Sequence, residues 1–443
     1  MLLQARRMRS FHLCPERSRR STHRRPVTFP VSGSHRYRLL VLTPAFPYPP
    51  VSGGDIRMFH LLRGLAQQFE IHLLSYSGGD SDRLIQETGI AAAHIHRATD
   101  NPTSWWQPMK GIGFWRYAPH GISLDVDPSY ANTLKRTLAS TQFHGVLIDH
   151  LYMMQYARFV RPRPVFYTAP DVETVKFERW HQGETLAPKR RFLHWAQRRV
   201  IRWYESRLWR RARVTFAAST VDRDLLVQMN RKGRFIVAPN GVDLSYFRPR
   251  SRSSFEGPPA IFFVGTMSYK PNYHAARFLA QEVFPRIRHH FPAAVCHLAG
   301  KTGKHDYAEL NHPELGVRMH GFVDDIRPFF AQCQILLVPL AMGSGTRIKI
   351  LEGMASGTPI VSTRVGAEGL EYTDGQNIVI ADSAVDLAAA AVRLLESREE
   401  CYRLGMAGRR LVEKQYSWDS SANIVRNEIS DILKEDAVRL AGC

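Results

Sequence analysis

The segment from Ile335 to Thr363 constrains the fold most, because strand-like and helix-like patterns alternate within one short stretch. An apolar run, Ile335 to Leu340, leads into the glycine-rich turn Gly343-Ser344-Gly345-Thr346. A helical stretch follows and stops at Gly357-Thr358-Pro359, where a second apolar run begins. Strands that alternate with helices in this way predict a parallel sheet covered by helices.

The helix of this segment has the residues of an anion-binding site. The first N–H groups of a helix lack intrahelical partners, and the helix dipole adds partial positive charge there. Arg347 and Lys349 add two full charges beside the predicted helix start at Gly345 and Thr346. These features favour a diphosphate, and Glu352 follows as an acid that can bind sugar hydroxyls.

The same alternation recurs along the chain and predicts an α/β protein with two Rossmann-like units. The 443 residues suit two or three domains. The predicted strands are 37–43, 70–75, 145–149, 214–218, 235–238, 260–264, 294–298, 316–319, 335–338 and 359–361. The predicted helices are 55–69, 383–396, 398–413 and 422–440.

Charge and composition limit the classes of partner that the protein is expected to bind and its expected location in the cell. The net charge is +20, and residues 1–38 hold ten arginines but one acid, Glu16. This excess favours an anionic partner, which is a nucleic acid, a membrane surface or an anionic substrate. No apolar run approaches the roughly 18 residues of a transmembrane helix, and the first residues are too basic for a signal peptide. The five cysteines form no C-x-x-C pair, so a reducing cytoplasm is the expected location.

Further motifs follow one another in a characteristic order. They are Pro47-Tyr48-Pro49-Pro50, Gly53-Gly54, Pro239-Asn240-Gly241-Val242-Asp243, Phe263-Val264-Gly265-Thr266, Gly321-Phe322-Val323, Gly366-Ala367-Glu368-Gly369-Leu370 and Tyr416-Ser417-Trp418. With the glycine-rich segment, they closely resemble the family-4 retaining glycosyltransferases of bacteria, the group 1 glycosyl transferases. The resemblance covers roughly residues 38–420. Within the family, Pro47 to Pro50 and Gly343 to Glu352 are similar to enzymes of exopolysaccharide assembly.

The resemblance implies the GT-B fold, in which two Rossmann-like domains face a central cleft. Residues 1–36 are expected to form a disordered basic arm. An N-terminal acceptor domain is expected over 37–247, a linker over 248–259 and a C-terminal donor domain over 260–415. The last segment, 416–443, is expected to be a helix that crosses back onto the N-terminal domain.

The resemblance also implies a set of site residues. His150, Arg347 and Lys349 are the expected catalytic residues, since fixed positive charge stabilises a departing nucleoside diphosphate. The expected donor-binding residues are Gly53, Gly54, Gly265, Phe322, Val323, Gly345, Thr346 and Glu352. Glu352 would bind the donor ribose. The expected co-substrate is a nucleotide-diphosphate sugar, with no metal and no further cofactor.

This chain departs from the family pattern at three places. Ser344 stands where relatives carry the first of two glutamates, so contacts to the transferred sugar are expected to differ. Thr266 and Asn272 stand where relatives carry an arginine and a lysine. The segment Pro170-Asp171-Val172-Glu173 replaces the pattern His-Asn-x-Glu, which predicts a different acceptor pocket.

The basic block 189–213 has two interpretations of equal weight. Aromatic and basic residues at helical spacing are typical of a helix that lies on a membrane surface. Such a helix would bring a cytoplasmic enzyme to a lipid-linked acceptor at the inner face of the plasma membrane. The other interpretation is a stripe that faces the interior, with solvated arginines. The loop residues Trp105-Trp106 and Phe114-Trp115 are further candidates for membrane contact.

Several alternatives remain open from the sequence. His150 is either a residue facing the donor sugar or a polar residue at a strand end. The Asp125-Val126-Asp127 pair resembles a metal site of the other glycosyltransferase fold, but Pro128 follows and favours a helix cap.

The expected activity is transfer to a lipid-linked or growing surface glycan. The alternatives are a sugar-nucleotide epimerase of the same fold and a basic nucleic-acid-binding protein, although no known nucleic-acid-binding module is present.

Overall fold

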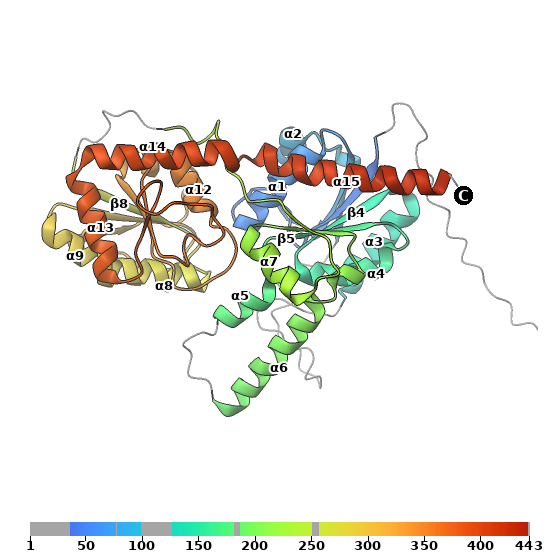
Figure 1. Cartoon of the computed structure of the whole chain (residues 1–443), viewed down its shortest axis with the longest axis horizontal. Helices are drawn as coiled ribbons and strands as arrows, with labels where there is room; N and C mark the ends of the chain where they lie inside the picture. The colour runs from blue at the N-terminus through green and yellow to red at the C-terminus, as the bar shows by residue number, and fades with distance from the viewer. Residues whose placement is uncertain (1–35, 77, 99–125, 181–186, 250–256, 442–443) are drawn as a thin grey trace, which may run out of the picture.

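The computed structural model describes residues 36–76, 78–98, 126–180, 187–249 and 257–441. Most of the predicted basic arm, the two aromatic loop pairs and Asp125 lie outside the described residues. Figure 1 shows two α/β units side by side, joined along one side by the last two helices.

The N-terminal sheet contains seven parallel strands in the order β3-β2-β1-β4-β5-β6-β7. The strands are β1 (Arg38–Leu42), β2 (Glu70–Tyr76), β3 (Ile95–Ala98), β4 (Gly145–Asp149), β5 (Val165–Ala169), β6 (Val214–Ala217) and β7 (Phe235–Val237). Alternate residues of β1 point to opposite faces. Leu39 and Val41 join one apolar core, and Leu40 and Leu42 join the other.

Helices cover both faces of this sheet. They are α1 (Gly53–Leu65), α2 (Ser81–Thr88), α3 (Pro128–Ser140), α4 (Ala157–Val160), α5 (Glu173–Trp180), α6 (Pro188–Glu205) and α7 (Thr220–Met229). Asp127 caps α3 by accepting hydrogen bonds from the N–H groups of Ser129 (2.7 Å) and Tyr130 (3.2 Å). The helix cap predicted at Asp127 is therefore confirmed.

The C-terminal sheet has six parallel strands in the order β10-β9-β8-β11-β12-β13. They are β8 (Ala260–Val264), β9 (Val295–Ala299), β10 (Val317–Met319), β11 (Ile335–Val338), β12 (Ile360–Ser362) and β13 (Val379–Ile380). The covering helices are α8 (Lys270–Phe278), α9 (Phe284–His290), α10 (Lys304–Leu310), α11 (Arg327–Gln332), α12 (Ile348–Ala355), α13 (Ala384–Glu396) and α14 (Arg398–Gln415). The α/β fold with two parallel Rossmann-like sheets is as predicted.

The last helix, α15 (Trp418–Ala441), leaves the C-terminal unit and packs on α1 of the N-terminal unit (Figure 1). Val425, Ile429 and Leu433 on α15 are fully buried in the same apolar core as Leu39 of β1. Gly64 lets α1 and α15 approach closely, because a Cβ at that position would collide with Ala422. The predicted return of the C-terminal helix is therefore confirmed. No helix in the described parts of the chain has both the length and the apolar content needed to cross a membrane.

Truncation of α15 at its buried face should destabilise the N-terminal unit. We expect Ile429→Ala to lower the free energy of unfolding by about 2–5 kcal/mol, because it leaves a cavity between α15 and the sheet. Val438→Ala, on the same helix but at a position 72% exposed, should change it by less than about 0.5 kcal/mol. Urea unfolding curves measure both values, and equal effects would show that this face of α15 is not buried.

Candidate active site

The loop between β11 and α12 lies where the carboxyl ends of the two sheets meet, which is the usual ligand-binding edge of such sheets. The Thr346 hydroxyl donates to the carbonyl of Ala218, just after β6 (3.3 Å). Asn240 donates from Nδ2 to the carbonyl of Thr346 (3.3 Å). The Ser344 hydroxyl donates to Asp171, just after β5 (3.0 Å). Residues of one domain therefore hold the glycine-rich loop of the other.

A charged pair reinforces this connection. Arg179 of α5 binds both carboxylate oxygens of Glu368 in the loop after β12, with Nη2 to Oε1 at 2.8 Å. Its Nη1 also donates to the carbonyl of Gly343 (3.0 Å). Bidentate pairs of this kind fix geometry as well as adding energy. Arg179 therefore helps to fix the position of the loop from the N-terminal side.

Arg347 occupies the N-cap position of α12, with φ −83° and ψ 98°. Its Nη1 donates to the carbonyl oxygens of Ser344 and Gly345, the latter at 2.7 Å. Its Nε and Nη2 are buried and have no hydrogen-bond partner within the described residues. Burial lowers the pKa of Arg347. A buried N–H donor without an acceptor is costly, so these two groups favour an anionic ligand.

One prediction about this loop is corrected. The helix begins at Ile348 and not at Gly345 and Thr346, because the loop remains irregular for three further residues. Gly345 has φ 75°, a left-handed conformation that glycine adopts without strain. A Cβ at Gly345 would also collide with the Asp171 carboxylate. Gly345 is therefore needed for the approach of the two domains.

Lys349 lies one residue inside α12 and points to the end of β8. Its Nζ donates to Oδ1 of Asn272 (2.9 Å) and lies 4.4 Å from the centre of the Phe263 ring. A Cβ at Gly265 would come within 2.8 Å of Nζ, so glycine leaves room for the ammonium group. Burial, reinforced by the charge of Arg347, lowers the pKa of Lys349 to about 7. Asn272 thus helps to position Lys349.

Glu352 lies one helical turn beyond Lys349 on α12 and is half-buried. Burial raises the pKa of its carboxyl to about 7, and the nearby Lys349 only partly opposes this. The two side chains therefore titrate in the same pH range. A change in the charge of one changes the charge that the other prefers.

His150 follows β4 in a strained conformation, with φ 66° and ψ 145°. Its Nδ1 lies 2.7 Å from the carboxylate of Asp149. Burial disfavours the charged imidazole, but Asp149 outweighs burial and raises the pKa of His150. A Cβ at Gly54 would lie 3.4 Å from Nε2 of His150. The structure thus brings His150 and Gly54 together, and positive φ at a non-glycine residue is typical of functional sites.

The remaining predicted donor residues lie along the same edge. Gly53, at the start of α1, approaches Ile348 of the opposite domain, with 3.7 Å between an ideal Cβ and Cδ1. The carbonyl of Gly321 accepts a hydrogen bond from the N–H of Gly300, which follows β9 (2.7 Å). The next residues are Phe322, which is 57% exposed, and Val323, which is half-buried.

Sequence reasoning missed Arg57, which is fully buried beneath the interface between the domains. Its Nη1 donates to Oδ1 of Asn240 (2.9 Å), and its Nε donates to Thr168 (3.3 Å). Burial lowers its pKa to about 10, although Asp149 opposes the shift. Arg57 lies among the apolar residues of α1. The sequence around it does not indicate that its side chain contacts Asn240 and Thr168.

Both halves of the chain match family models of glycosyltransferases. Residues 51–246 match the model described as Glycosyltransferase Family 4. Residues 258–397 match the model described as Glycosyl transferases group 1. Together the two models span most of the chain, and both describe glycosyltransferases. Both models end short of α15.

Curated relatives match parts of this chain. An MMP alpha-(1->4)-mannosyltransferase of Mycolicibacterium hassiacum is 31% identical over 140 residues, which are 31% of this chain and 33% of the relative. A glycogen synthase of Mycobacterium tuberculosis is 24% identical over 267 residues, which are 58% of this chain and 62% of the relative. The chain therefore spans between about a third and three fifths of the curated relatives it matches.

Solved structures share the whole fold at low sequence identity. Sucrose-phosphate synthase from Thermosynechococcus elongatus superposes with a TM-score of 0.70 and 17% identity, covering 90% of this chain and 100% of that protein. HepE of Anabaena, in complex with UDP and glucose, has a TM-score of 0.64 and 15% identity, covering 89% and 100%. These similarities establish the GT-B fold.

The strain at His150 predicts a reversal of the usual effect of glycine on stability. At ordinary positions glycine is less stabilising than alanine by about 0.5–1 kcal/mol. At φ 66° we expect His150→Gly to be more stable than His150→Ala by about 1 kcal/mol, because only glycine adopts this conformation without strain. Chemical denaturation of the two variants measures the difference. The usual order, with alanine more stable, would show that His150 is unstrained.

Proposed function

We propose that this protein transfers a sugar from a nucleotide-diphosphate sugar to a lipid-linked or growing surface glycan, with retention of anomeric configuration. The main support is the pair of buried N–H donors of Arg347 that have no acceptor among the described residues, beside the ammonium group of Lys349. A diphosphate supplies the negative charge and the acceptor oxygens that these donors lack. The fold shared with HepE, whose structure is in complex with UDP and glucose, supports the same class of donor.

In the proposed reaction, the bond between the sugar C1 and the diphosphate oxygen breaks while C1 bonds to the acceptor hydroxyl oxygen. The acceptor proton leaves with the diphosphate, and negative charge grows on that group as the bond breaks. Arg347 and Lys349 would stabilise this charge, so the reaction would need no metal ion. Glu352 would bind the donor ribose, and His150 would face the transferred sugar. Retention rests on the family resemblance.

The decisive experiment removes the ammonium group. We expect Lys349→Ala to lower kcat about a hundredfold at saturating donor, which corresponds to about 3 kcal/mol of lost transition-state stabilisation. Arg347→Ala should behave similarly. Glu352→Gln should mainly raise KM, because a ribose contact is present in both the ground state and the transition state. Steady-state kinetics with a screened panel of nucleotide sugars measures these values.

Arg393→Ala is the matched control, because Arg393 is an exposed cation of the same domain. Within the described residues, its one salt bridge is with Glu400, at 2.8 Å. This variant should keep wild-type kcat and KM. Near wild-type kcat in Lys349→Ala would place the diphosphate elsewhere and contradict the proposal.

Binding of UDP should be coupled to uptake of a proton by Lys349. Its pKa of about 7 leaves the side chain mostly neutral at pH 8 in the free protein. A bound diphosphate raises this pKa, since an adjacent negative charge favours the ammonium form. We therefore expect uptake of up to one proton at pH 8 and almost none below pH 6, where Lys349 is already charged. Calorimetry in buffers of different ionisation enthalpy measures this uptake.

Two variants distinguish proton uptake by Lys349 from proton uptake by Glu352. Lys349→Met should abolish proton uptake at pH 8, whereas Glu352→Gln should retain most of it. Uptake that persisted in Lys349→Met and disappeared in Glu352→Gln would assign the proton to the carboxyl group instead.

The acceptor side of the proposal rests on α6, which projects away from both sheets in Figure 1. Phe192, Trp195 and Trp203 are more than half exposed, at 58%, 51% and 53%. Arg199 lies over the ring of Trp195 at 4.9 Å, and Arg207 lies over Trp203 at 4.4 Å. Exposed aromatic residues with adjacent cations are typical of helices at the surface of anionic membranes.

The other face of this block belongs to the protein core. Ile201, Tyr204 and Leu208 are buried against the N-terminal sheet. Part of the block 189–213 therefore faces the protein interior, and part is exposed. We propose that the buried residues anchor α6 and that the exposed aromatic residues place this cytoplasmic enzyme at the inner face of the plasma membrane, close to a lipid-linked acceptor.

Replacing the three exposed aromatic residues should weaken membrane binding selectively. We expect the triple variant Phe192→Ser, Trp195→Ser and Trp203→Ser to bind anionic vesicles at least about tenfold more weakly, a loss of about 1.4 kcal/mol. Leu315→Ser is the control, since Leu315 is 56% exposed on the other domain. Vesicle co-sedimentation measures both variants, and an unchanged triple variant would exclude α6 as the contact.

A further inference from the structure

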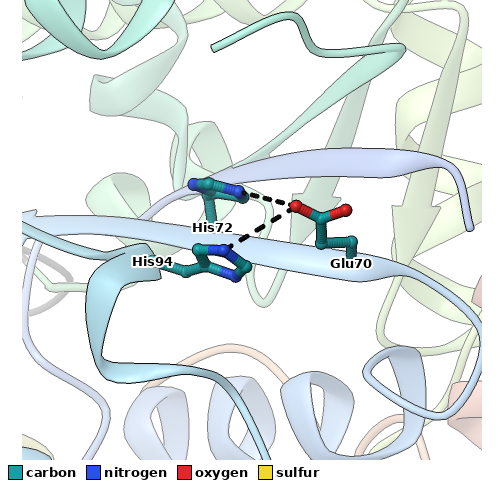
Figure 2. Close-up of side chains that lie close together, drawn as sticks. All are labelled: Glu70, His72 and His94. Carbon is teal, nitrogen blue, oxygen red and sulfur yellow. Dashed lines mark hydrogen bonds and ion pairs between the residues drawn. The ribbon is translucent and has the colours of Figure 1, made fainter. Parts of the chain in front are cut away.

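We propose that Glu70, His72 and His94 form a binding site for one divalent transition-metal ion, zinc in the first instance, apart from the active site. Glu70 begins β2, and His72 is two residues further on the same face of that strand. His94 ends the short 3₁₀ turn Ala92–His94 just before β3. Figure 2 shows both imidazole rings directed toward one carboxylate oxygen of Glu70.

The spacing of the three groups fits a metal ion. Oε1 of Glu70 lies 3.4 Å from Nε2 of His72 and 3.7 Å from Nε2 of His94. Zinc bonds of about 2.0–2.1 Å in a tetrahedron separate neighbouring ligand atoms by roughly 3.3–3.4 Å. All three ligand atoms lie within 4.8 Å of one another, so they must draw closer together to share one ion. Two histidines and one carboxylate leave a fourth position for water.

A second histidine interaction supports this assignment. Nδ1 of His72 lies 3.2 Å from Nε2 of His96 on β3. Histidines that bind metal generally use one ring nitrogen for the metal and donate from the other to a fixed acceptor. His96 can be that acceptor, which would direct the lone pair of Nε2 of His72 toward the ion.

The surroundings hold His72 in place. Its side chain is 5% exposed, its ring stacks on His94 at 3.8 Å, and it meets Phe143 edge-on at 4.9 Å. Arg38 donates from Nε to both oxygens of Glu70 at 3.0 Å, which fixes the carboxylate while its charge opposes a cation.

The location indicates a structural role. Glu70 and Arg38 are paired at the amino ends of β2 and β1, whereas the candidate active site lies at the carboxyl ends of the strands. β3 is the last strand at its edge of the sheet. A shared metal ion would tie the turn before β3 to β2, and so fix the edge of the N-terminal domain.

The test uses the full chain in metal-free buffer, titrated with Zn²⁺ by calorimetry and with Co²⁺ by visible absorption. We expect one zinc ion per chain and a tetrahedral cobalt spectrum, both lost in His72→Ala and in His94→Ala. His96→Ala should keep the site but weaken affinity about 10–100-fold. Arg38→Met should tighten binding, because it removes an adjacent positive charge.

His320→Ala is the matched control, because it disrupts another histidine pair, in which Nδ1 of His297 lies 2.9 Å from Nε2 of His320. This variant should bind zinc like the wild type. Glu70→Gln keeps the size of the side chain, so it serves as the test variant if the histidine variants fail to fold. We expect Glu70→Gln to bind zinc at least tenfold more weakly. Zinc binding unchanged in Glu70→Gln, or lost in His320→Ala, would overturn the proposal. Chelation should lower Tm without changing the affinity for UDP, so the outcome is independent of the proposed transfer reaction.

Discussion

The proximity of two half-buried cations, Arg347 and Lys349, is the constraint around which the interface between the domains is organised. The charge of Arg347 disfavours the charge of Lys349, and burial disfavours both. The backbone carbonyls of Ser344 and Gly345 hold the guanidinium group, while Asn272 and the ring of Phe263 hold the ammonium group. These partners are neutral, so they position the charges without cancelling them. A carboxylate in direct contact would have neutralised the site before a ligand arrived.

The acids near this loop contact other groups. Asp171 accepts hydrogen bonds from Ser344 and from Lys176, and Glu368 is held by Arg179. The serine at position 344, where the family resemblance implies a glutamate, instead places a hydroxyl against Asp171 of the opposite domain. Asp171 lies in the segment 170–173, where the resemblance also implies a different pattern.

Local patterns predicted the strands well where an apolar run had clear limits. Residues 145–149 were predicted as a strand and form β4 with the same bounds, since apolar residues there are bordered by Gly145 and Asp149. β3 was not predicted, because the edge strand Ile95–Ala98 contains two polar residues and lacks a clear pattern. β5 was also missed, although Val165–Ala169 is fully buried. Its short run follows prolines, which resemble a loop signal.

The site was predicted in part, because motifs specify residues but not their distant partners. The structure brings Lys349 together with Gly265, and His150 with Gly54, while the roles of these residues in binding and catalysis stay predictions. The contacts of Arg57 with Asn240 and Thr168 depend on segments far apart in the sequence. The positive φ of His150 is equally invisible in the sequence, since nothing nearby calls for it. The sequence left both interpretations of the block 189–213 open, and the structure buries Ile201 and Tyr204 while it exposes Trp195 and Trp203.

The hydrogen bonds across the domains at Thr346 and Ser344 have a thermodynamic consequence. The loop that would carry the diphosphate is also the surface on which the other domain rests. A ligand that binds more tightly while these hydrogen bonds are intact must therefore strengthen the association of the two domains. By reciprocity, whatever separates the domains must weaken the binding of that ligand by the same factor. Occupancy of the loop and association of the domains are thus thermodynamically linked.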